Sequence, residues 1–129
     1  MYMLDTDSVS YALRGQGRLG TRIAQLRPSA LCISAITAAE LRFGADRRKW
    51  AKIHNLIDVF TATVAVVPFD DGCAAHYGTI ASELARRGTP IGALDVLVAA
   101  HAMAIGATLV TNNVKHFSRV RGLDVENWL

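Results

Sequence analysis

Short apolar runs alternate along the chain with longer segments whose apolar residues recur at the helical period. Four runs are short and either continuously apolar or β-branched, which predicts strands at 1–4, 31–33, 63–67 and 108–111. The spacing between them predicts helices at 9–13, at 21–26, from a cap at Ser34 or Thr37 to about 45, at 50–60, at 72–87 and at 93–105. Residues 112–117 are expected to form a loop or a helical turn, and Val125 to start a small edge strand. This alternation indicates an α/β fold of three layers, with a short, mainly parallel sheet flanked by helices.

Composition supports a single domain over residues 1–129, because 51% of the residues are hydrophobic and 19% are charged. No apolar run reaches the roughly 18 residues that a membrane span needs. Asp5 and Asp7 lie where a signal peptide would carry basic residues. Cys32 and Cys73 are isolated in apolar surroundings, which is typical of core thiols in a reducing compartment. The sequence therefore predicts a cytoplasmic globular protein.

The net charge of +3 favours polyanionic partners, though only mildly. The basic residues gather in three places: Arg42, Arg47, Arg48, Lys49 and Lys52; then Arg86 and Arg87; then Lys115, Arg119 and Arg121. Solvated helix faces explain any one of these clusters. Three clusters in a chain that also carries isolated acids are equally consistent with a surface that binds phosphate groups.

Three acidic residues stand in unusual surroundings. Asp5 follows the first predicted strand, at the end where open α/β sheets bind ligands. Glu40 lies among small and apolar residues, and Asp95 is the only charge in the apolar segment 91–105. Each has an ordinary alternative. Asp5 could cap the first helix, Glu40 could complete a capping box with Thr37, and Asp95 could be a first-turn acid favoured by the helix dipole.

Taken together, the three acids predict a metal site. A buried carboxylate without a partner is costly, and no Lys or Arg lies within one helical turn of Asp95. A hard cation such as Mg²⁺ or Mn²⁺ would neutralise several carboxylates at once. It would also polarise a phosphate and lower the pKa of a bound water.

Four segments then resemble the PIN-domain VapC toxins, over essentially the whole chain. They are Leu4-Asp5-Thr6-Asp7; Ser34-x-x-Thr37-x-x-Glu40-Leu41; Gly92-x-x-Asp95-x-x-x-Ala99-Ala100-His101-Ala102; and the closing stretch from Gly106 to Leu123, which contains Thr111-Asn112-Asn113-Val114-x-His116-Phe117. The resemblance implies a three-layer PIN fold and a Mg²⁺- or Mn²⁺-dependent endoribonuclease that cleaves structured RNA, with tRNA ahead of ribosomal RNA. It also implies a homodimer held inactive by a VapB-type antitoxin.

The resemblance makes Asp5, Glu40 and Asp95 the metal-binding catalytic acids, but the fourth acidic position departs from the family pattern. Asn113 and His116 stand where relatives carry an acid. The amide oxygen of Asn113 can still ligate a metal or hold a water, so it joins the predicted catalytic residues. A neutral imidazole is a poor Mg²⁺ ligand, so His116 is predicted to be auxiliary, and one catalytic metal ion is expected.

Further roles are predicted around this centre. Asp7 would restore part of the missing charge and Thr111 would orient a water. The residues expected to hold the RNA backbone are Arg86, Arg87, Lys115 and Arg119. An antitoxin helix is expected in a groove formed with the region 42–50, for which the candidate lining residues are Tyr11, Leu13, Phe43 and Trp50. Ordinary core packing explains each of those four side chains equally well.

Two other functions fit parts of the sequence. Asp5-Thr6-Asp7 after a strand also resembles the start of an aspartyl-phosphate phosphotransferase, with Asp70-Asp71 as its late acidic pair and Lys115 as its lysine. That alternative leaves Glu40 and Asp95 without a purpose. The second alternative is a catalytically weak PIN fold that binds RNA or protein, which the non-acidic Asn113 and His116 would suit.

Overall fold

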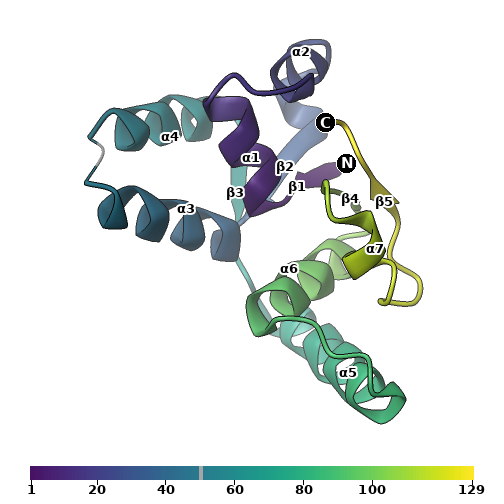
Figure 1. Cartoon of the computed structure of the whole chain (residues 1–129). Helices are drawn as coiled ribbons and strands as arrows, with labels where there is room; N and C mark the ends of the chain where they lie inside the picture. The colour runs from purple at the N-terminus through teal and green to yellow at the C-terminus, as the bar shows by residue number, and fades with distance from the viewer. Residues whose placement is uncertain (50) are drawn as a thin grey trace.

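A computed structural model describes residues 1–49 and 51–129 and contains one sheet of five parallel strands (Figure 1). The strands are β1 (Tyr2–Leu4), β2 (Leu31–Ser34), β3 (Ala65–Val67), β4 (Thr108–Val110) and β5 (Val125–Glu126), in the spatial order β3-β2-β1-β4-β5. The helices are α1 (Thr6–Leu13), α2 (Leu19–Ala24), α3 (Ala35–Arg47), α4 (Ala51–Thr63), α5 (Asp71–Arg87), α6 (Ala93–Ala104) and α7 (Val114–Phe117), with a short 3₁₀ turn at Pro28–Ala30. The predicted parallel α/β fold is confirmed.

Alternate residues of the central strands point to opposite faces of the sheet, as the period of a strand requires. On one face, Met3, Cys32 and Leu109 pack against α5, α6 and α7. On the other face, Leu4, Ile33 and Val110 pack against α1, α2, α3 and α4. Figure 1 shows these two groups of helices on either side of the strands. Both cysteines are buried free thiols, as the sequence indicated.

Side chains at the carboxyl ends of the strands start the main helices. The Asp5 carboxylate accepts a hydrogen bond from the Ser8 amide at 2.8 Å, so α1 begins at Thr6, earlier than the predicted residue 9. The Ser34 hydroxyl accepts from the Ile36 amide at 3.0 Å and caps α3. Since the cap is Ser34, the alternative of a capping box formed by Thr37 with Glu40 is wrong. Asp5 directly follows β1 and Ser34 is the last residue of β2, which places both helix starts along one edge of the sheet.

The predicted strand at 63–67 is partly wrong. Helix α4 continues to Thr63, and only Ala65–Val67 form β3. The Thr63 hydroxyl hydrogen-bonds the Phe60 carbonyl within the helix, an arrangement that lets a β-branched threonine end a helix. The segment 112–117 contains the short helix α7, and Val125 begins the parallel edge strand β5 as expected. No helix in the described part of the chain is long and apolar enough to cross a membrane.

Candidate active site

A cavity of about 230 Å³ opens at the carboxyl end of β1 and brings the three predicted acids together. We call it the carboxylate cavity; its lining residues are Asp5, Thr6, Asp7, Glu40, Asp95 and Val98. Asp5 follows β1, Glu40 lies in α3 and Asp95 lies in the first turn of α6. Parallel strands end at the same edge of a sheet, so helices that start or pass there can direct side chains towards one point. Among residues 1–49 and 51–129, no lysine or arginine lines this cavity.

Asp5 is the most deeply placed of the acids, with 7% of its surface exposed. Its backbone amide donates to the Val110 carbonyl of β4 at 3.0 Å, which fixes the residue at the centre of the sheet. Burial raises the pKa of the Asp5 carboxyl, and hydrogen bonds from Thr111 and Ser8 partly offset that rise. Asp5 therefore caps α1 and lines the cavity at once, so both of its predicted roles are compatible.

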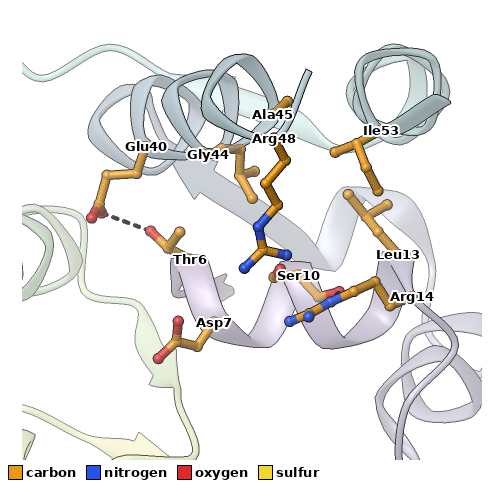
Figure 2. Close-up of a pocket in the computed structure, with 11 residues that line it drawn as sticks. Thr6, Asp7, Ser10, Leu13, Arg14, Glu40, Gly44, Ala45, Arg48 and Ile53 are labelled. Atoms are coloured by element: carbon orange, nitrogen blue, oxygen red, sulfur yellow. Dashed lines mark hydrogen bonds between the residues drawn. The ribbon is translucent and has the colours of Figure 1, made fainter. Parts of the chain in front are cut away.

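Glu40 of α3 is half-buried, and a residue of the neighbouring helix α1 holds its side chain. The hydroxyl of Thr6 donates to its Oε1 at 2.7 Å, which Figure 2 shows as the contact between the two helices. Burial is the largest cause that raises the pKa of Glu40, and the negative charges of Asp95, Asp7 and Asp5 raise it further. Its surroundings therefore contain excess negative charge, and no Lys or Arg among the described residues forms an ion pair with Glu40.

Asp95 is less buried than its apolar sequence context predicted. Its side chain is 42% exposed, because the residues that begin α6 face the edge of the molecule and only later positions enter the core. Its Oδ2 lies 2.9 Å from Nε2 of His116, a residue of α7. Asp95 is thus both a first-turn acid of α6 and a member of the cavity.

The donor chemistry of the cavity fits a divalent cation. Carboxylate oxygens are the ligands that Mg²⁺ and Mn²⁺ prefer. The neighbouring acids raise the pKa of Glu40, which shows that their negative charges repel one another. However, no three His, Cys, Asp or Glu side chains in the described residues are gathered closely enough to hold one ion as they stand. Each predicted ligand is instead engaged in a hydrogen bond with Ser8, Thr6 or His116. Side-chain rotation would be needed to bring them around a metal.

The other predicted site residues lie at different distances from this centre. Asp7 is exposed and lines the cavity, and Thr111 is fully buried next to Asp5. Asn113 is exposed at the start of α7 and does not line the cavity. His116 reaches the site only through its hydrogen bond to Asp95. The structure therefore places Asn113 outside the cavity that holds Asp5, Glu40 and Asp95.

The basic residues predicted to hold RNA form a separate cluster. Arg87 pairs with Glu83 at 3.6 Å and also donates to the Arg119 carbonyl, while Arg119 donates to the Pro90 carbonyl at 3.2 Å. Arg86 and Lys115 are exposed. None of these four side chains lines the carboxylate cavity. Two of them are thus partly occupied in joining α5 to the segment after α7.

Two arginines that the sequence did not single out for RNA lie nearer the acids. Arg14 and Arg48 line a second pocket, of about 220 Å³, which shares Thr6, Asp7 and Glu40 with the carboxylate cavity (Figure 2). Arg48 was one member of a predicted basic cluster, whereas Arg14 stood alone in the sequence. Their convergence depends on α1 packing against α3, which no local sequence signal reveals.

The predicted antitoxin groove is only partly formed by the residues proposed for it. Leu13 lines a pocket of about 370 Å³ together with Ile53 and Leu56. Phe43 is 63% exposed and carries the Arg47 guanidinium over its ring, at 5.8 Å from the ring centre. Tyr11 packs against the core beneath α1, and Trp50 lies outside the described residues.

The aspartyl-phosphate alternative finds no support in this arrangement. Asp70 caps α5 by accepting from the Cys73 amide at 3.1 Å, and Asp71 is the first residue of that helix. Neither residue, nor Lys115, lines the cavity that contains Asp5. A phosphotransferase of that kind would need these groups around the same carboxylate.

Comparison with known proteins shows the family to which the chain belongs. A PIN domain family model matches residues 2–123. The tRNA(fMet)-specific endonuclease VapC of Salmonella typhimurium is 36% identical over 129 residues, which cover 98% of this chain and 97% of that protein. Ribonuclease VapC2 of Rickettsia felis is 36% identical, over 99% and 98% of the two chains. A crystal structure of VapBC2 from Rickettsia felis, bound to a DNA fragment from their promoter, contains a chain with a TM-score of 0.91 and 35% identity, over 99% of this chain and 98% of that one. This chain therefore belongs to the PIN-domain family, among the VapC ribonucleases.

Proposed function

We propose that this protein is the endoribonuclease toxin of a toxin–antitoxin pair, that it needs Mg²⁺ or Mn²⁺, and that Asp5, Glu40 and Asp95 form its catalytic centre. The observation that carries the proposal is the convergence of these carboxylates, from three separate elements, on one cavity without a basic residue. Such an arrangement costs folding free energy unless a cation or a substrate uses it.

The proposed substrate is a structured RNA, with tRNA as the first candidate and ribosomal RNA as the second. The Salmonella relative is named as a tRNA(fMet)-specific endonuclease, which makes tRNA the substrate to test first. Exposed loops are the favoured targets, because their unstacked bases are open to contact by side chains. Backbone phosphates that lie outside the cavity are proposed to bind four basic residues: Arg86, Arg87, Lys115 and Arg119.

Each catalytic residue is given a defined orientation by a neighbour in this chain. Ser8 fixes the Asp5 carboxylate, Thr6 fixes Glu40, and His116 fixes Asp95. Asp5, Glu40 and Asp95 would hold the divalent ion, and Asp7 would contribute from the same cavity. Asn113 lies outside the cavity and would have to approach it to contribute its amide oxygen. When bound, that ion would polarise the phosphate and lower the pKa of water. We expect products with a 5′-phosphate and a 3′-hydroxyl.

The proposed partners are a VapB-type antitoxin and a second copy of this chain, in the cytoplasm. The Rickettsia felis structure is a VapBC2 assembly, which supports an antitoxin partner. The pocket formed by Leu13, Ile53 and Leu56 is the candidate contact for an amphipathic antitoxin helix. The homodimer follows from the family resemblance alone.

The test is cleavage of total cellular RNA by the purified protein with Mg²⁺, Mn²⁺ or EDTA, beside Asp95→Asn. Discrete fragments that need the metal and disappear in the variant are the expected result, and mapping their ends identifies the target. Asp58→Asn is the matched control, since Asp58 on α4 pairs with Arg42 of α3 and does not line the carboxylate cavity. Equal cleavage by wild type and Asp95→Asn would remove Asp95 from its proposed role.

One observation favours the alternative of a binding module. His116 stands at a position where the family resemblance placed a fourth acid, and its Nε2 lies 2.9 Å from Oδ2 of Asp95. If the protein binds RNA without cleaving it at any metal concentration, a catalytically weak PIN fold becomes the better description.

A further inference from the structure

The pocket that holds Arg14 and Arg48, here called the arginine pocket, lies between α1 and α3 and continues directly from the carboxylate cavity. The two share Thr6, Asp7 and Glu40 in their walls. Figure 2 shows the acids at one end of the pocket and both guanidinium groups reaching towards Ser10 at the other. A ligand that occupies the cavity and extends along this surface would pass from acids to arginines.

Neither guanidinium is neutralised within the chain. Among the described residues, no carboxylate comes within 4.0 Å of Arg14 or Arg48, although Arg42 pairs with Asp58 and Arg121 with Glu83. Glu40 shares the pocket, but its Oε1 accepts a hydrogen bond from the Thr6 hydroxyl at 2.7 Å and forms no ion pair with either arginine. The Arg14 side chain is held in place over the Tyr11 ring, 5.7 Å from its centre. Arg14 Nε also donates to the Ser10 carbonyl at 3.3 Å, and the side chain lines the pocket that contains Leu13, Ile53 and Leu56 as well. Two guanidinium groups without a carboxylate partner in one pocket suit an anionic ligand.

Gly44 gives independent support for a ligand in this pocket. It lies in the interior of α3, where glycine destabilises a helix relative to alanine. A Cβ atom added to Gly44 would meet nothing within 4 Å, so internal packing does not require the glycine. Because Gly44 lines the arginine pocket, a side chain there would take up space between the acids and Arg48. The glycine keeps that space open.

We propose that the arginine pocket binds a phosphate group of the RNA backbone adjacent to the phosphate at the carboxylate cavity, with Arg14 and Arg48 as its ligands. The inference rests on the proposed ribonuclease function and names a subsite of it. The Ser10 hydroxyl provides a further donor, and Gly44 permits close approach of the backbone. The subsite would position the strand without reading its sequence.

The experiment measures binding of a labelled single-stranded RNA oligonucleotide by fluorescence anisotropy, in EDTA so that cleavage does not interfere. Arg14→Gln and Arg48→Gln are each expected to weaken binding about three- to tenfold. The double variant should reduce the slope of log affinity against log salt by about 0.7, for one phosphate contact on a single strand. Arg27→Gln is the control, because Arg27 is exposed before β2 at the opposite edge of the sheet.

Gly44→Ala provides a test in which weaker RNA binding cannot be explained by loss of folding. Gly78 lies within α5, and a Cβ atom there also meets nothing within 4 Å, so Gly78→Ala is its matched control. Both substitutions should raise Tm by a few degrees, yet only Gly44→Ala should weaken RNA binding.

The subsite is overturned if the double variant binds RNA with the affinity and salt dependence of Arg27→Gln, or if Gly44→Ala and Gly78→Ala bind equally. It is also overturned if the arginine variants lose binding only to an acidic antitoxin peptide and still bind RNA with wild-type affinity. Metal-dependent cleavage is a separate measurement. RNA binding through Arg14 and Arg48 without cleavage would retain the subsite and reject the nuclease. Cleavage with an unchanged KM in the double variant would reject the subsite alone.

Discussion

The ring of His116 and the carboxylate of Asp95 form a hydrogen bond between α7 and α6, with 2.9 Å between Nε2 and Oδ2. This contact occupies one carboxylate oxygen of a residue that lines the carboxylate cavity. It also places a nitrogen donor where the family resemblance placed an acid. The contact therefore sets how readily Asp95 is released to a cation.

His116→Glu is expected to strengthen divalent-metal binding by about tenfold, because a carboxylate adds an oxygen ligand and removes the bond that holds Asp95. Isothermal titration with Mn²⁺ measures the affinity directly. His76→Glu makes the same charge change on α5, where His76 bonds only the Gly72 carbonyl, and should leave the affinity unchanged. An unchanged or weaker affinity in His116→Glu would show that His116 does not restrain the site.

Thr6→Val is expected to lower kcat by about tenfold, since it removes the 2.7 Å bond that orients Glu40 and leaves the apolar bulk in place. Thr6→Ser should restore most of the activity, because the serine hydroxyl can still donate to Glu40. Thr79→Val is the control for the loss of a helical threonine hydroxyl, as Thr79 bonds only within α5. If Thr6→Val and Thr79→Val cleave RNA alike, Thr6 is not a positioning residue.

Asp5→Asn is expected to abolish cleavage and to stabilise the metal-free fold by about 1 kcal/mol at neutral pH. Burial raises the pKa of Asp5, so its ionised form destabilises the fold, and stability is lost as pH rises from the unfolded value of 3.8 through the higher folded one. Asparagine keeps the cap of α1 without the charge. Denaturant unfolding in EDTA measures the difference.

The same substitution at Asp70, Asp70→Asn, should lower the stability of the fold at neutral pH. Hydrogen bonds from Cys73 lower the pKa of Asp70, so its ionised form is favoured in the fold above pH 3.8, and Asp70→Asn loses that contribution at neutral pH. Both residues cap helices, which makes the pair a matched comparison. Equal effects at the two caps would mean that the burial of Asp5 carries no cost.

His101 predicts a separate dependence of stability on pH. Its ring is fully buried with Nδ1 2.8 Å from the Ser34 hydroxyl, and burial lowers its pKa below 6.5 while Asp70 partly opposes the shift. The unfolded chain therefore binds the proton more readily, and stability falls as pH drops below 6.5 towards the lower folded pKa. His101→Asn should remove this part of the slope in unfolding curves taken between about pH 5 and pH 8. An identical slope in both proteins would contradict the assignment.

The sequence was informative where a local pattern decides the structure. Continuously apolar runs predicted strands covered on both faces, and Met3 and Leu4 do pack on opposite layers. The acid in the apolar helix α6 was the strongest signal for the site, and Asp95 lies in the carboxylate cavity. The period of apolar residues does not specify the order of strands, since β1, β2 and β4 are all equally apolar.

Contacts between distant segments could not be predicted from the sequence. Thr6 bonds Glu40 only because α1 packs on α3. The same packing brings Arg14 and Arg48 to one pocket. The predicted RNA contacts Arg87 and Arg119 were chosen as charge clusters, but a cluster in sequence does not show that Glu83 and nearby carbonyls already engage them. Local burial was also overestimated for Asp95, because the first turn of a buried helix can remain at the edge.

The central position of β1 has a consequence for how the protein is made. Tyr2 pairs with Leu31 on one side and with Thr108 on the other, and the amide of Asp5 is anchored by Val110. The middle of the sheet therefore stays open during translation until β4 has left the ribosome, since a nascent chain cannot form contacts with residues not yet synthesised. We expect a partly synthesised chain to lack the assembled carboxylate cavity, and therefore to lack ribonuclease activity until β4 has joined the sheet.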